Sequence, residues 1–112
     1  MHDVRTERER RVSVVCASGE LDAYAAPDLD AAFAGLSGAR LVLADLGSVS
    51  FMDSTALGVL VRSVRGFRQT NADVRVVLPR GPARRIFEIT ALDGELPVAA
   101  DRSAAVAELE AG

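Results

Sequence analysis

Apolar side chains recur along this chain with two spacings, one of two residues and one of three to four. Alternation with a period of two predicts a strand over residues 12–19. The charged start of the chain is expected to hold a short first strand within 3–9. The apolar run LVLADL at 41–46 is typical of a central strand that is covered on both faces. Two further strands are predicted, VRVVLP at 74–79 and a short one, PVAA, at 97–100.

Helical spacing predicts four helices in the intervening and final segments. The first covers about 27–36, with a proline in its first turn and glycines that end it. The second, 57–67, has the clearest apolar stripe, and a third and a fourth are predicted at 83–92 and 103–110. The residues expected to face the core in the first three helices are Leu29, Ala32, Phe33 and Leu36; Leu57, Leu60, Val61, Val64 and Phe67; and Ile86, Ile89 and Leu92.

Strands that alternate with helices predict an α/β sandwich. We expect a single domain over 1–112, with a mixed four- to five-stranded sheet and about four helices, because 112 residues suit one hydrophobic core. The net charge of −3 and the pI near 5.1 argue against direct binding of nucleic acid. No apolar run approaches the roughly 18 residues that span a bilayer, and the first residues are charged, so a cytoplasmic protein without a membrane partner is expected.

Several residue types that carry catalysis are scarce. The chain has no lysine, which removes a phosphate-binding loop of the GKS type and a Schiff-base mechanism. One histidine and one cysteine cannot build a common zinc site, and the histidine, His2, is expected on a frayed terminus. Cys16 is expected to be a buried strand thiol. We therefore predict that the protein is not an enzyme and needs no cofactor.

The stretch FMDSTALG, 51–58, places an acid and two hydroxyls where a buried strand passes into the second helix. Asp53 suits the N-cap of that helix, because its carboxylate can accept from free amides in the first turn. The large apolar pair Phe51 and Met52 is expected to stay partly exposed. A phosphate on Ser54 would lie at the positive end of the helix dipole. Helix capping alone and a phosphorylated serine switch are both open interpretations of this stretch.

Three segments in order resemble the STAS domain of bacterial anti-sigma-factor antagonists: GELDAYAAPDL, VLADLGSVSFMDSTALGVL and RRIFEITALDGELPV. The resemblance runs from about residue 12 to the C-terminus. It implies that Ser54, between Asp53 and Thr55, is phosphorylated by a partner anti-sigma factor, which is a serine kinase with its own ATP site. It also implies that the unphosphorylated protein docks on that kinase and releases its sigma factor, and that a protein phosphatase resets the switch. The implied partner-binding surface consists of Asp22, Met52, Asp53, Ser54, Thr55 and Gly58.

The chain departs from the family pattern at Ala56 and Ala91, where the family commonly has glycine. Alanine favours helix by up to about 1 kcal/mol over glycine. Ala56 would also add a methyl group beside Ser54, where it bears on close approach by the partner.

Two other functions remain open on the sequence. One is a structural STAS subunit of a lipid-transport assembly without a phosphate cycle, and the other is a sensor of a nucleotide or small ligand at the helix N-terminus. Arg84 and Arg85 are expected to be solvated rather than to bind a partner. Glu20, Asp22, Asp28 and Asp30 would be either a rim for a basic partner or ordinary acids at a helix start.

Overall fold

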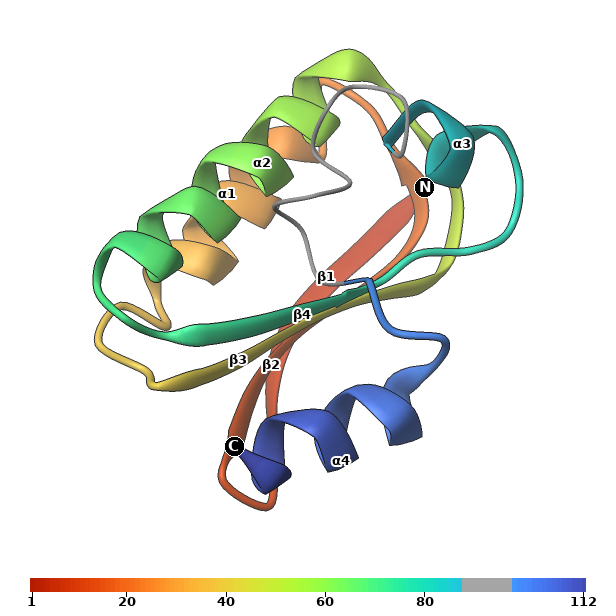
Figure 1. Ribbon diagram of the computed structural model, residues 1–112. Coiled ribbons are helices and arrows are strands. Elements are labelled where there is room, and N and C mark those ends of the chain that lie inside the picture. Colours follow the sequence, from red (N-terminus) through yellow and green to blue (C-terminus); the bar gives the residue numbers. More distant parts are fainter. Residues whose placement is uncertain (88–97) are drawn as a thin grey trace.

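A computed structural model of the protein describes residues 1–87 and 98–112. A four-stranded sheet lies between helices α1 and α2 on one face and α4 on the other (Figure 1). Strand β1 is antiparallel to β2, while β2, β3 and β4 run parallel, in the spatial order β1-β2-β3-β4. The predicted α/β fold with a mixed sheet is confirmed. The elements are β1 (His2–Glu9), β2 (Val12–Leu21), α1 (Ala26–Ala34), β3 (Leu41–Met52), α2 (Ser54–Gln69), β4 (Asp73–Val77), α3 (Pro82–Phe87) and α4 (Arg102–Ala111).

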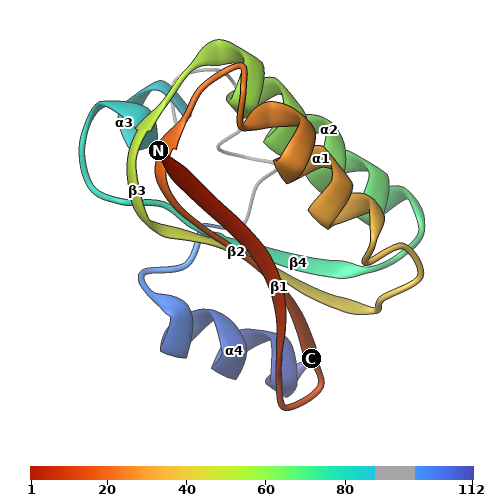
Figure 2. The ribbon, with the colours of Figure 1, turned by 180° about the vertical axis from the view of Figure 1, so that it is seen from behind.

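The two central strands bury both of their faces, as the run at 41–46 predicted. On β2 and β3, Val15 and Val42 belong to the core under α1 and α2. Val14 and Leu43, their neighbours in sequence, belong to a second, smaller core under α4. The view from behind shows α4 against the sheet face opposite α1 and α2 (Figure 2). Successive side chains point to opposite faces of a strand, so a continuous apolar run feeds two cores.

Both central strands are longer than predicted. Strand β3 continues from Leu46 to Met52, and β2 continues past Gly19 to Leu21. The two extensions pair with each other, with Leu21 opposite Met52, through a register that shifts twice. The predicted ends of both strands were wrong. Glycine and serine are typical of turns, so they indicated that the strands stop, whereas in the structure these residues take part in an irregular pairing of β2 with β3.

The first residues of the chain form the edge strand β1. Strand β1 pairs with β2 along its whole length, which confirms the expected first strand. His2 was wrongly expected on a frayed end. Its Nε2 lies 2.8 Å from Asp28 Oδ2, in a hydrogen bond that ties β1 to α1.

The helices match prediction in place and differ in detail. The buried face of α2 consists of Ala56, Val59, Leu60, Val64 and Phe67. Leu57 and Val61 of the predicted stripe are partly buried and pack against the border of this core, whereas Ala56 and Val59 were not predicted to face it. The rings of Phe33 in α1 and Phe67 in α2 meet edge to face, with centroids 6.4 Å apart. No described helix is long and apolar enough to cross a membrane.

The C-terminal part of the fold is described in two pieces. Helix α3 confirms the start of the helix predicted at 83–92, whose remainder, with Ala91, Ile89 and Leu92, lies outside the described residues, as does the side chain of Ile86. Of the strand predicted at 97–100, Val98 forms a single parallel bridge to Val76. The predicted terminal helix is confirmed as α4.

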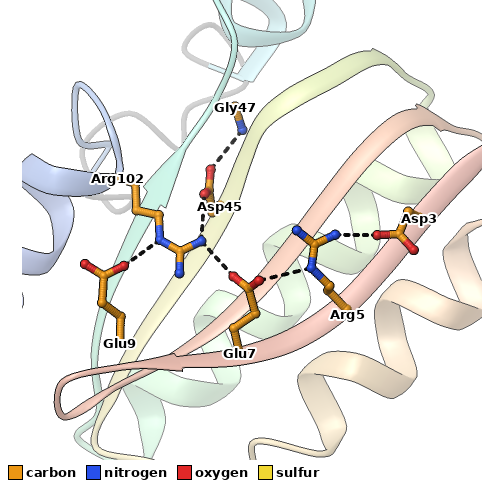
Figure 3. A network of polar contacts seen from close by, with 7 residues as sticks. All are labelled: Asp3, Arg5, Glu7, Glu9, Asp45, Gly47 and Arg102. Carbon is orange, nitrogen blue, oxygen red and sulfur yellow. Dashed lines mark hydrogen bonds and ion pairs between the residues drawn. The ribbon is translucent and has the colours of Figure 1, made fainter.

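Ion pairs connect α4 to strands β1 and β3 of the sheet. Arg102, at its first turn, contacts Glu7, Glu9 and Asp45, and Arg5 extends this network along β1 (Figure 3). The hydrogen bond from Arg102 lowers the pKa of Glu7. Cys16 lies in β2 but is only partly buried, so the prediction of a buried thiol was wrong, although burial still raises its pKa.

Candidate functional site

The candidate site lies where β3 passes into α2. Asp53 has an extended backbone, with φ −89° and ψ 178°, and its Oδ1 accepts a hydrogen bond of 2.9 Å from the amide of Ala56. The carbonyl of Asp53 accepts from the amide of Leu57 at 3.0 Å. This is the N-cap geometry that the sequence predicted, and it satisfies one of the free donors in the first turn of α2.

A second loop is held against this helix start. The amide of Asp53 donates to the carbonyl of Leu21 over 3.0 Å, so the loop after β2 lies beside the loop after β3. In the β2 loop, Asp22 Oδ1 accepts from the amides of Tyr24 and Ala25 at 3.0 and 3.1 Å. The structure therefore brings Asp22 and Asp53 into one surface, and both carboxylates organise the backbone of their own loops.

Two exposed hydroxyls occupy the first turn of α2. Ser54 is the first helical residue and Thr55 the second, and both are exposed. Neither hydroxyl makes a hydrogen bond to another described residue. A hydroxyl in this position is accessible to a second protein, and the positive end of the helix dipole favours a negative charge there.

The other predicted site residues divide between surface and core. Gly58 lies one turn after Ser54 and is partly exposed. Met52 is partly buried and packs against the core under α1 and α2, so it contributes to the sheet as well as to the surface. Ala56 is fully buried, with an exposed fraction of 0%. The methyl group of Ala56, whose effect on close approach by a partner the sequence left open, therefore lies in the core and not on the surface beside Ser54.

Exposed aromatic side chains flank the site. Phe51 on β3 is 52% exposed, which confirms the expected exposure before the helix. Tyr24, in the loop after β2, is 87% exposed and was missed by the sequence reasoning. Its signal was an aromatic residue inside the polar GELDAYAAPD segment. Large exposed aromatic residues are common at protein interfaces.

Charged groups around the site are mostly engaged in local contacts. Glu20 forms an ion pair with the N-terminal amine, and Asp28 forms a hydrogen bond with His2, so both acids already have local partners. On α3, Arg85 is exposed and Arg84 partly exposed. Among the described residues, no group of three or more histidine, cysteine, aspartate or glutamate side chains could hold a metal ion.

The fold and the site together define a class of small α/β domains that present a hydroxyl side chain at a helix start, directly after a central strand of the sheet. Within this class the sequence profile of the STAS domain matches residues 3–105. The chain belongs to the STAS domain family.

The relatives of the chain narrow the resemblance further. An anti-sigma-B factor antagonist of Staphylococcus aureus is 30% identical over 92 residues, which cover 80% of this chain and 85% of that protein. The crystal structure of an anti-sigma factor antagonist from Mycobacterium paratuberculosis has a TM-score of 0.86 at 29% identity, and covers 98% of this chain and 95% of its own. The Bacillus cell fate determinant SpoIIAA in its phosphorylated form shares the fold, with a TM-score of 0.74 at 22% identity over 95% of this chain and 98% of its own. The predicted resemblance to anti-sigma factor antagonists is confirmed.

Proposed function

We propose that this protein is an anti-sigma factor antagonist of the partner-switching type, acting as one domain over 1–112. Unphosphorylated, it binds an anti-sigma factor serine kinase and releases the sigma factor that the kinase holds. Its docking surface consists of Asp22, Met52, Asp53, Ser54, Thr55 and Gly58, with Phe51 and Tyr24 at its border. The observation that carries the proposal is the exposed Ser54 hydroxyl at a capped helix start, in a chain whose relatives are anti-sigma factor antagonists.

The chemistry of the switch belongs to the partner. The kinase transfers the γ-phosphoryl group of ATP to Ser54 Oγ, so one O–P bond forms, the bond to ADP breaks, and the hydroxyl proton passes to a base of the kinase. This chain supplies the acceptor and its orientation, is not itself an enzyme and needs no cofactor. A protein phosphatase returns Ser54 to the hydroxyl. The proposal requires neither direct nucleic-acid binding nor a membrane, and it places the protein in the cytoplasm.

The phosphate acts by charge and bulk. It brings about −1.5 to −2 charges into the centre of the docking surface. Reversing occupancy from 1:99 to 99:1 needs roughly 5.5 kcal/mol of differential affinity. Truncating one partner of a buried charge pair in an interface already costs about 2–5 kcal/mol, so a buried unpaired dianion has the required magnitude. The fold accommodates such a group, as the phosphorylated form of SpoIIAA indicates.

The test is a phosphorylation assay with an anti-sigma factor serine kinase from the same organism. After incubation with ATP, intact mass is expected to rise by one phosphate, and fragment spectra are expected to place it on Ser54. Ser54→Ala should abolish the addition, while the matched control Thr55→Ala, which removes the adjacent exposed hydroxyl, should retain it. Phosphate on another residue, or none with an active kinase, would overturn the assignment of Ser54.

A further inference from the structure

One basic side chain on α2 leans toward the candidate phosphorylation site. Arg62 lies two turns beyond Ser54, with Gly58 between them at intervals of four residues. The Nη1 atom of Arg62 lies 3.3 Å from the position that a β-carbon on Gly58 would occupy. Long side chains on a helix point back toward its N-terminus. The guanidinium of Arg62 therefore lies beside Gly58, about one turn nearer to Ser54 than its own backbone.

The remaining gap matches the size of a phosphate. Four residues of α-helix correspond to about 6 Å along the axis, which separates the level of Gly58 from that of Ser54. A phosphate on Ser54 extends the side chain by a phosphorus atom and its oxygens, and Arg62 can move without moving the backbone. A β-carbon at position 58 would lie 3.3 Å from Nη1 of Arg62, so it would crowd the guanidinium. With glycine at this position, no side chain of residue 58 lies between the serine and the guanidinium.

Within residues 1–87 and 98–112, no contact holds the side chain of Arg62 in place. It makes no hydrogen bond or ion pair with any described residue and is exposed. It shares with Asp30 of α1 a hollow of about 350 Å³ between α1 and α2, yet the two side chains form no ion pair there. Arg62 is also the first basic residue after Ser54 on α2. Arg62 is therefore available as a counter-ion. A phosphate on Ser54 would lie next to the carboxylate of Asp53, and a nearby cation would offset the repulsion between these two anions.

We propose that Arg62 reaches across Gly58 and binds the phosphate on phosphorylated Ser54, forming an ion pair within the chain. The inference rests on the proposed function, since it assigns a role to Arg62 only in the phosphorylated protein. Arginine binds phosphate through two parallel hydrogen bonds, which gives the pair a defined geometry. The pair holds the phosphate over the first two turns of α2 and draws Arg62 away from the hollow beside Asp30.

The ion pair is tested by the second ionisation of the phosphate. Phosphoserine is placed at position 54 during translation, so the measurement does not depend on any kinase, and the phosphorus-31 chemical shift is followed from pH 4 to 9. A nearby guanidinium favours the dianion, so the second pKa, ordinarily near 6, is expected to be lower in the otherwise unchanged chain than in Arg62→Gln by about half a unit. The control is Arg68→Gln, which removes the same charge about 21 Å along the axis from Ser54, beyond the screening length of about 10 Å in 0.1 M salt.

A second variant tests whether the space above Gly58 is needed for Arg62 to approach the phosphate. Gly58→Ala keeps every ionisable group and adds only the methyl group that crowds Arg62. It should raise the phosphate pKa part of the way toward the value in Arg62→Gln, while circular dichroism shows an intact helix. Equal pKa values in the unchanged chain, Arg62→Gln and Arg68→Gln, with all three folded, would overturn the ion pair and leave the phosphorylation proposal standing. Failure of the kinase to modify Ser54 would overturn the proposed function without altering this measurement.

Discussion

Replacing Asp53 by alanine separates the structural role of the FMDSTALG stretch from its regulatory role. The change removes Oδ1, which accepts from the amide of Ala56 at 2.9 Å. Loss of an N-cap costs about 0.5–2 kcal/mol. Ala56 is fully buried, so water replaces the lost acceptor poorly and the cost should lie in the upper part of that range, about 1.5 kcal/mol. For a domain of this size the melting temperature should fall by about 6 °C.

The assay is urea unfolding followed by circular dichroism, with Asp53→Asn as the matched control. Asparagine keeps a side-chain oxygen in the capping position and should retain most of the stability. The reasoning is refuted if Asp53→Ala unfolds at the same urea concentration as the unchanged chain. If Asp53→Asn loses as much as Asp53→Ala, the negative charge rather than the hydrogen bond stabilises the start of α2.

Two further predictions follow from the contacts described above. Ser54→Ala should lose no more than about 1 kcal/mol of stability, because Asp53 still caps α2, and it should bind the kinase and stay bound. Ser54→Asp should also fold, but calorimetry should show that it binds the kinase at least tenfold more weakly than Ser54→Ala. Equal affinities of the two folded variants would show that Ser54 is not the switch. The hydrogen bond from Arg102 lowers the pKa of Glu7, so the stability that this carboxylate contributes is present above the ordinary glutamate pKa of about 4.3 and is lost as pH falls below it. Arg102→Gln should therefore reduce the difference between urea midpoints at pH 7 and pH 3, and an unchanged difference would contradict the role of this pair.

Much of the site was predictable because its signals are local. An acid before two hydroxyls and an amphipathic segment predicts a capped helix start, since an N-cap needs only its own side chain and the next few amides. The buried run at 41–46 likewise predicts a central strand, because its apolar character on both faces excludes an exposed position. Asp53, Ser54 and Thr55 therefore lie where the sequence placed them.

Features that depend on distant segments were not predictable in this way. The ladder from Gly19 to Leu21 exists only because β3 supplies a partner as far as Met52, and neither segment has strong strand propensity alone. The joining of Leu21 to Asp53, which brings Asp22 to the site, follows from that same pairing.

The sequence by itself determined which residues can cap, accept a phosphate or enter a core, because these capacities belong to side chains and their near neighbours. Only the tertiary structure decided which of them face the surface. Ala56 points inward and Tyr24 outward because of where the sheet lies relative to α2 and the β2 loop, and burial is a property of that arrangement rather than of residue type. The position of the Arg62 side chain beside Gly58 also depends on its rotamer and on the space around it, and the sequence pattern does not specify either of these.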